Sequence, residues 1–318
     1  MFEITSKLSL KKFAVALAVM LILVKAGLLI KQRYIPNQTG AVKGARIEKL
    51  SLPNLALPPK TINRSQPNIS TKFFALYSPE SGYLVTGKDA EKPVPIASLT
   101  KMMTAIVVAQ NMDVTKQITI SRNAVSEIGS DAGLKIGETL SVEDGLKALL
   151  ISSANDAAYA LAENFQGGVQ QFVTKMNETA VDLGLHDTEF KDPAGLDDGG
   201  HSTAKELAII ASYLLTNERL ARIVGTSETD IYSTNYHLKH HLKNSNRLLQ
   251  DELYYPGILG VKTGFTPEAG HSITVAATRD HHTLIAIILN TYLNTKDASA
   301  KEGARLLDWG FENLSWGS

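Results

Sequence analysis

A serine and a lysine stand three residues apart in the segment ASLTK, at Ser98 and Lys101. Residues at this spacing share one face of a helix, so the hydroxyl and the amine there can reach hydrogen-bonding distance. A lysine whose pKa is lowered by burial can take the proton of a serine hydroxyl and make it a nucleophile. The spacing alone is weak support for this chemistry, because Ser9 and Lys12 show it too.

The residues around this pair predict a helix that begins close to Ser98. Pro93 and Pro95 lie just upstream and do not fit inside a helix, which places its start after them. Lys101 then lies in the first turn, near the positive end of the helix dipole, which lowers the pKa of an amine. Apolar residues follow at helical spacing: Met102, Ala105, Ile106 and Ala109.

A second hydroxyl, paired with an amide, occurs in ISSANDAAYALAE at Ser153 and Asn155. This polar break lies between two predicted helices and can present its side chains to a cleft. Ser153 is suited to pass a proton, and the Asn155 amide to hold a substrate backbone. Ser-x-Asn is a common pattern, however, and Asn155 taken alone is better explained as the cap of the helix that follows.

The third pattern is Lys262, Thr263 and Gly264 in GVKTGFT, on a predicted strand. An amine and a hydroxyl side by side on a strand can bind a carboxylate, and the glycine leaves room for a substrate to approach. The three patterns together are more specific than any one of them. Ser-x-x-Lys, Ser-x-Asn and Lys-Thr-Gly, in this order, are the signature of β-lactamases and penicillin-binding proteins.

The elements that must position these residues follow from hydrophobic periodicity. Residues 72–87 predict a β-hairpin with its turn at PESG, and the middle of the chain is mostly helical. From Gly257 onward, three β-rich runs predict sequential antiparallel strands, and an amphipathic helix follows them. This order predicts one sheet built from both ends of the domain, with a helical region inserted between the strands.

From about residue 70 to the C-terminus the chain resembles the D-alanyl-D-alanine carboxypeptidase family of low-molecular-mass penicillin-binding proteins. The segments that carry the resemblance are PIASLTKMMTA, LLISSANDAAYALAE, GLHDTEF, GLDDGGHSTAKELA and GVKTGFTPEAGHSITVAAT. The resemblance implies an α/β (α+β) fold of the β-lactamase and penicillin-binding-protein type, with an antiparallel sheet flanked by helices and an inserted, mostly helical subdomain. It also implies a serine-type D-Ala-D-Ala carboxypeptidase that acts on peptidoglycan stem peptides, is acylated by β-lactam antibiotics and uses no cofactor or metal.

The resemblance assigns a role to each pattern residue. Ser98 is the expected acyl-enzyme nucleophile, Lys101 its general base, and Ser153 a proton relay. Asn155 is expected to position the substrate. Lys262 and Thr263 are expected to bind the terminal carboxylate. The backbone N–H groups of Ser98 and Phe265 are expected to form an oxyanion hole.

Three departures from the family pattern stand out. Ala154 occupies the middle of Ser-x-Asn, where relatives often have glycine. Relatives commonly carry an arginine after the last strand that helps to bind the carboxylate, whereas this chain offers only Lys296 there. Many relatives add a C-terminal β-domain and a membrane-binding tail, so an anchor in this chain is expected at the N-terminus instead.

Other functions fit the same residues less well. A class A β-lactamase needs a glutamate that activates the deacylating water, and FKDPAGLDDGGHSTA has no Glu-x-x-Leu-Asn motif. An inactive wall-binding relative is expected to lose Ser98, Lys101 or Lys262, and all three are present. A D,D-endopeptidase that cuts peptidoglycan cross-links uses the same residues, so it stays open as the main alternative.

The N-terminus predicts the location. Residues 13–30 form an apolar run interrupted only by Lys25 and preceded by Lys7, Lys11 and Lys12. A run of this length nearly spans a bilayer core, and no small-residue cleavage site follows it. We therefore expect a membrane anchor or signal segment at 1–33, a proline-containing linker at 34–69 and a penicillin-binding serine peptidase domain at 70–318, on the extracytoplasmic side.

Composition excludes several classes of site. The formal net charge is +0, which gives no basis for a nucleic-acid partner, and the absence of cysteine excludes disulfides and thiolate chemistry. The histidines at 237, 240 and 241 lack a carboxylate at the usual ligand spacing. They favour a polar surface over a metal site.

Overall fold

The computed structural model describes residues 56–62, 66–250, 252–295 and 297–317, all within a unit that runs from Asn54 to Ser318. The apolar run at 13–30 and most of the expected linker lie outside the described residues. Within the described residues, none of the helices has the length and apolar character that a membrane span requires. Part of the expected linker, β1 (Lys60–Thr61), pairs with β13 (Leu314–Ser315).

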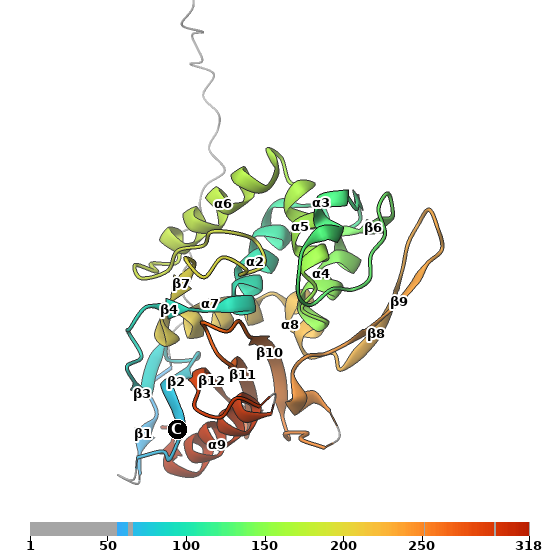
Figure 1. Ribbon diagram of the computed structural model, residues 1–318. Helices are drawn as coiled ribbons and strands as arrows, with labels where there is room; N and C mark the ends of the chain where they lie inside the picture. Colours follow the sequence, from blue (N-terminus) through green and yellow to red (C-terminus); the bar gives the residue numbers. More distant parts are fainter. Residues whose placement is uncertain (1–55, 63–65, 251, 296, 318) are drawn as a thin grey trace, which may run out of the picture. The chain divides into compact units, whose positions relative to one another are not determined.

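A five-stranded antiparallel sheet with the order β10-β11-β12-β2-β3 lies at the centre of the domain (Figure 1). Its strands come from both ends of the domain: β2 (Thr71–Ser78), β3 (Tyr83–Lys88), β10 (Ile258–Gly264), β11 (Ser272–Arg279) and β12 (His282–Thr291). The predicted hairpin and the three predicted late strands are therefore confirmed, as is their union in one sheet.

The sheet is buried on both faces, because its central strands are apolar at successive positions. In β12 the side chains of Ile285, Ile287 and Leu289 join the larger core, which the inserted helices complete. The alternating Leu284 and Ile288 join a second core on the opposite face. Since side chains alternate across a strand, a continuous apolar run supplies both cores at once.

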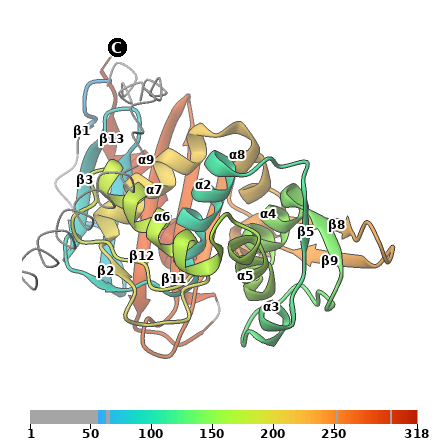
Figure 2. The same ribbon diagram turned by 90° about the horizontal axis from the view of Figure 1, so that it is seen from above.

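Helix α9 (Ala298–Asn313) covers the second core (Figures 1 and 2). It approaches the sheet closely because it carries glycine where it meets the strands. A Cβ at Gly310 would lie 2.6 Å from Leu284 and 2.8 Å from Leu76, and one at Gly303 would lie 3.0 Å from Val275. The two glycines stand seven residues apart, so they lie on one face of the helix.

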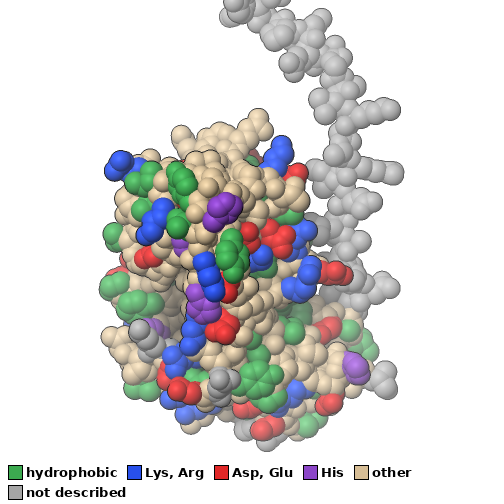
Figure 3. Space-filling view, turned by 90° about the vertical axis from the view of Figure 1, so that its right-hand side faces the viewer, with side chains coloured by type: hydrophobic (Ala, Val, Ile, Leu, Met, Phe, Trp, Pro, Cys, Tyr) green, Lys and Arg blue, Asp and Glu red, His purple; other side chains and the backbone are tan. Residues whose placement is uncertain are grey.

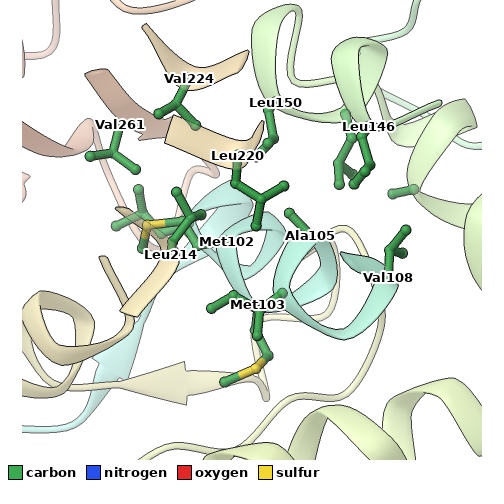
Figure 4. Close-up of a cluster of buried hydrophobic side chains, with 14 of the residues drawn as sticks. Met102, Met103, Ala105, Val108, Leu146, Leu150, Leu214, Leu220, Val224 and Val261 are labelled. Carbon is green, nitrogen blue, oxygen red and sulfur yellow. The ribbon is translucent and has the colours of Figure 1, made fainter. Parts of the chain in front are cut away.

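The other face of the sheet contacts α7 (Ala204–Thr216) and α8 (Glu218–Val224), and the helical region continues from them. Helix α2 (Lys101–Asn111) lies inside this region and is buried over its first two turns. Figure 4 shows the apolar side chains of α2 among those of α4, α7 and α8. The other helices of the region are α3 (Arg122–Ser126), α4 (Val142–Ile151), α5 (Asn155–Glu163) and α6 (Gly168–Asp182).

Short strand pairs connect these parts. They are β4 (Val94–Pro95) with β7 (His201–Ser202), β5 (Gln117–Thr119) with β6 (Thr139–Ser141), and β8 (Glu228–Tyr232) with β9 (Lys239–Lys243). The β8–β9 hairpin extends at the edge of the helical region (Figures 1 and 2). His240 on β9 is buried against Glu138, with its Nε2 atom 2.6 Å from Oε1, so the expectation of a polar surface is wrong for this histidine.

Charges of both signs are distributed over the face shown in Figure 3. Lysine and arginine side chains lie among aspartate and glutamate side chains there, in keeping with a net charge of +0. Single surface ion pairs of this kind, such as Lys205 with Glu91, contribute little to stability. Folding therefore depends on the two apolar cores.

Candidate active site

Ser98 lies in a short 3-10 helix, η1 (Ala97–Thr100), that leads directly into α2. The predicted helix start is thus close to its position in the structure, but the first turn is tighter than an α-helix. Ala97 has a left-handed backbone with φ +48°, a conformation that non-glycine residues rarely adopt. This turn leaves the Ser98 side chain partly exposed, while Leu99 and Thr100 are buried.

Lys101 is the first residue of α2, and its side chain has no exposed surface. Its Nζ atom lies 2.8 Å from Ser98 Oγ, 2.7 Å from Asn155 Oδ1 and 2.9 Å from the carbonyl oxygen of Ala194. Burial lowers the pKa of Lys101 from 10.5 to about 7, although the nearby carboxylates of Asp192 and Asp156 act in the opposite direction. Both forms of the amine are therefore populated near neutral pH.

The three contacts of Lys101 fix the direction of its lone pair when the amine is neutral. The Asn155 amide oxygen and the Ala194 carbonyl oxygen are acceptors only, so each takes one of the two remaining N–H groups. The lone pair then points toward Ser98, whose hydroxyl can donate. This arrangement has the geometry of a general base and its nucleophile.

Two separate segments hold the acceptors for Lys101. Asn155 begins α5, with Ala154 as its N-cap, and the Asn155 amide also donates to the carbonyl of Ile128. Ala194 belongs to a loop organised by Asp192, whose carboxylate accepts hydrogen bonds from four backbone N–H groups at 2.6–2.9 Å. The oxygen and the nitrogen of the Asn155 amide thus each bind a protein group.

The Asp192 loop also packs directly on the serine turn. Gly195 has φ +76°, and a Cβ there would lie 1.9 Å from the carbonyl oxygen of Ala97. No side chain fits that space, so glycine is required at this position for two reasons. The close contact holds η1, and with it Ser98, against the loop that carries Ala194.

Ser153 and Lys262 form a second hydroxyl–amine pair in the site. Ser153 has φ +63°, which turns the chain sharply between α4 and α5, and its hydroxyl accepts a hydrogen bond from Lys262 Nζ at 2.8 Å. Lys262 Nζ also donates to the Thr263 carbonyl oxygen at 2.9 Å. Burial, and next the charge of Lys101, lower the pKa of Lys262 well below its ordinary value.

Strand β10 brings the Lys-Thr-Gly residues against the serine turn. A Cβ at Gly264 would lie 3.0 Å from the Ile96 carbonyl oxygen and 3.3 Å from the Leu99 backbone nitrogen. The space beside Gly264 therefore contains the serine turn, where the sequence predicts room for a substrate. Phe265, which follows, is half exposed, and its ring stacks on His271 with centroids 4.4 Å apart.

The structure thus gathers six of the predicted residues in two sets of polar contacts: Ser98, Lys101 and Asn155 in one, and Ser153, Lys262 and Thr263 in the other. Sequence reasoning missed the Ala194 carbonyl, the Asp192 carboxylate that positions it, and Ser245, whose hydroxyl contacts Thr263. The segment KDPAG contains a signal for the first two, since Asp-Pro and Gly favour a turn that an aspartate side chain organises. Lys296 lies outside the described residues.

Comparison with known proteins places this arrangement in a family. The model of the D-alanyl-D-alanine carboxypeptidase family matches residues 60–292. The D-alanyl-D-alanine carboxypeptidase DacF of Bacillus subtilis is 35% identical over 246 residues, which are 76% of this chain and 62% of that protein. A D-alanyl-D-alanine endopeptidase of Pseudomonas aeruginosa is 29% identical over 254 residues, 79% of this chain and 81% of that protein.

The crystal structure of the Streptomyces K15 DD-transpeptidase has the same fold. It superposes with a TM-score of 0.73 at 30% identity and covers 78% of this chain and 99% of that one. The chain belongs to the D-alanyl-D-alanine carboxypeptidase family, and the predicted fold class is confirmed. The chain spans 62% and 63% of the length of two curated carboxypeptidases that it matches.

Proposed function

We propose that the protein is a serine-type D-Ala-D-Ala carboxypeptidase that trims peptidoglycan stem peptides through an acyl-enzyme on Ser98. The observation that carries the proposal is the contact between Ser98 and a fully buried Lys101, whose pKa lies near 7. The family of the chain and the names of its relatives support the choice of substrate.

The first chemical step uses the direction of the Lys101 lone pair. Lys101 takes the Ser98 proton while Ser98 Oγ attacks the carbonyl carbon of the penultimate D-Ala, which gives a tetrahedral intermediate. Backbone N–H groups of Ser98 and Phe265 are proposed to stabilise its oxyanion. The intermediate collapses when the C–N bond breaks, and the terminal D-Ala leaves as an amine that takes up a proton.

Ser153 is proposed to deliver that proton. Its hydroxyl contacts Lys262 at 2.8 Å, so it can give its own proton to the leaving amine and recover one from charged Lys262, while Lys101 keeps the proton that it took from Ser98. Lys262 and Thr263 are proposed to bind the terminal carboxylate of the substrate. A carboxylate beside Lys262 would raise the pKa of this lysine and favour its charged form. Water then hydrolyses the Ser98 ester: its proton returns through Ser153 to Lys262, and Lys101 gives its proton back to Ser98 Oγ.

Intact-protein mass spectrometry with a fluorescent penicillin tests the proposal. We expect the wild-type chain to gain one adduct and Ser98→Ala to gain none, while circular dichroism shows the same fold for both. A wild-type chain without an adduct, or an adduct on Ser98→Ala, would contradict the mechanism.

The D,D-endopeptidase activity stays a second candidate, because one relative at 29% identity bears that name. Incubation with pentapeptides that end in D-Ala-D-Ala, and separately with cross-linked muropeptides, distinguishes the two. A carboxypeptidase releases free D-Ala from the pentapeptide and leaves the cross-linked dimer intact. Cleavage of the dimer with no D-Ala release would favour the endopeptidase.

An extracytoplasmic site of action, with an N-terminal anchor, completes the proposal. The apolar run at 13–30 and the lysines before it support it. Alkaline carbonate extraction of membranes from cells that produce the full chain tests the anchor. We expect the protein to stay in the membrane pellet, and its release by carbonate would contradict an uncleaved anchor.

A further inference from the structure

A second hydroxyl lies beside the proposed carboxylate-binding residue Thr263, on a loop outside the three sequence patterns. The Ser245 Oγ and Thr263 Oγ1 atoms are 2.6 Å apart, and either atom can be the donor. Among the described residues, no other hydrogen bond to either hydroxyl is present. The two hydroxyls therefore form an isolated pair in the site.

The backbone that carries Ser245 is held firmly in place. Its N–H donates to the carbonyl of Ile151, the last residue of α4, at 3.0 Å. Both neighbours are buried asparagines: the Asn244 amide donates to the Thr226 carbonyl at 2.8 Å, and Asn246 Oδ1 accepts from a backbone N–H at 3.0 Å. The loop therefore sets the position of Ser245 beside Thr263.

The number of protons on the two hydroxyls determines whether Thr263 can donate to an anion. A hydroxyl has a single proton, so a Thr263 that donates to Ser245 has nothing left to donate to a carboxylate. When Ser245 donates instead, the Thr263 proton is free, and the chain from Ser245 through Thr263 to an anion is polarised in one direction. An anion bound at Thr263 therefore favours this second arrangement.

We propose that Ser245 is a positioning residue that orients the Thr263 hydroxyl toward the terminal carboxylate of the substrate. The inference rests on the proposed function, because it assigns a partner to a residue of that site. It also means that two uncharged hydroxyl groups, those of Ser245 and Thr263, contribute to recognition of the carboxylate. Since Ser245 is bonded to the end of α4, just before Ser153, the same loop links carboxylate recognition to the proposed proton relay.

The test compares two peptide substrates that differ only in the terminal group. One is an N-acylated peptide that ends in D-Ala-D-Ala with a free carboxylate, and the other is its C-terminal carboxamide. We expect Ser245→Ala to raise KM for the free acid about tenfold, the size of one lost hydrogen bond to a charged group, with kcat within about twofold of wild type. The kinetics of the carboxamide should stay unchanged, and Ser245→Thr should restore the KM for the free acid.

A matched serine serves as the control for a merely structural effect. The Ser152 hydroxyl donates to the Ala148 carbonyl at 2.9 Å, close to the same loop, so Ser152→Ala should leave the preference for the free acid as in wild type. Thr263→Val should reduce the preference at least as much as Ser245→Ala does, and the double variant should lose no more than Thr263→Val alone.

Either of two results with Ser245→Ala would overturn the inference: a preference for the free acid as large as that of wild type, or an equal loss of activity toward both peptides. A wild type that does not prefer the free acid would overturn it as well. The failure of the proposed function is a different observation, since it appears as a wild-type chain that penicillin does not acylate.

Discussion

At the scale of single residues, the site depends on two lysines that folding removes from water. Lys101 and Lys262 are both buried, and burial lowers the pKa of each. The cost of burying an ammonium group is reduced when the amine becomes neutral, and a neutral amine is the form that a general base needs. Burial of Lys101 therefore supports its proposed role as general base.

The depressed pKa of Lys101 predicts a pH profile. Below about pH 7 Lys101 is mostly protonated, so the rate of acylation by penicillin should rise about tenfold per pH unit up to that point. Above it, the amine is neutral and the rate should level off. Stopped-flow acylation from pH 5 to pH 9 measures this, and a rate that still rises tenfold per unit at pH 9 would contradict a pKa near 7. Because Lys101 and Lys262 interact, the pKa obtained from the rising part of this profile belongs to the two lysines together.

The left-handed backbone of Ser153 predicts that glycine is a more stable replacement than alanine at this position, although neither supplies the hydroxyl. At φ +63° a glycine has no Cβ strain, so Ser153→Gly should unfold at higher urea concentration than Ser153→Ala, by about 1 kcal/mol of unfolding free energy. Both variants lack the hydroxyl and should turn over D-Ala-D-Ala peptides at least 100-fold more slowly than wild type, on the order of a lost proton relay. Equal stability of the two variants would contradict the strain.

Residue types were the part of the site that the sequence revealed best. The patterns located Ser98, Lys101, Ser153 and Lys262 because their chemistry needs those types at those spacings. They did not reveal Ser245, since its proposed role depends on a contact with Thr263. The two residues are 18 positions apart in the chain and meet only when the protein folds. The Ala194 carbonyl was equally hidden, because a backbone group has no signature in the sequence.

At the scale of elements, the serine turn is positioned by loops on either side of it. Gly195 contacts it from the Asp192 loop, and Gly264 contacts it from β10. The sequence predicted the helix after Ser98 from its periodicity and the hairpin from its turn residues. It did not predict the 3-10 geometry of η1, because that turn is shaped by neighbours that are distant in sequence.

A pair of glycine variants tests the contact between Gly195 and Ala97. Gly195 and Gly184 have similar backbones, with φ +76° and +73°, but a Cβ at Gly184 meets nothing within 4 Å. In both Gly195→Ala and Gly184→Ala the free energy of unfolding should fall by the roughly 1–2 kcal/mol that a left-handed alanine costs. Only Gly195→Ala should also displace Ala97 and slow acylation by penicillin.

Urea unfolding and the rate of fluorescent-penicillin labelling measure these two effects. We expect labelling of Gly184→Ala to match wild type and that of Gly195→Ala to fall at least tenfold, on the scale of a small misplacement of a reacting group. Equal labelling of the two variants would show that the contact with Ala97 does not position Ser98.

At the scale of the whole domain, the two apolar cores lie on opposite faces of the sheet, and only one of them adjoins the proposed site. The core beneath α9 contains none of the proposed site residues, whereas the larger core surrounds α2 and Lys101. The sequence predicted the sheet and its late strands because their apolar runs are long. It did not predict how closely α9 packs, which depends on Gly303 and Gly310 meeting particular side chains.

This separation predicts a variant with low stability and intact chemistry. Gly310→Val places side-chain atoms against Leu76 and Leu284, and overpacking of this kind costs about 1–3 kcal/mol of unfolding free energy. Glu312→Val, two residues later on the exposed side of α9, should cost only a few tenths. Thermal unfolding should separate the two, while penicillin labelling at low temperature should be the same for both. Slower labelling of Gly310→Val would show that the two faces are coupled.

The strand order β10-β11-β12-β2-β3 also sets when the site is completed during synthesis. Ser98 and Lys101 leave the ribosome early, but Lys262 follows only after the whole helical insertion, and β10 joins the sheet beside β11. A nascent chain, or a fragment that ends before residue 258, has the serine and its base without the strand that lies against them. We therefore expect products that end before residue 258 to be inactive, because the proposed site needs the strand that carries Lys262 and Thr263.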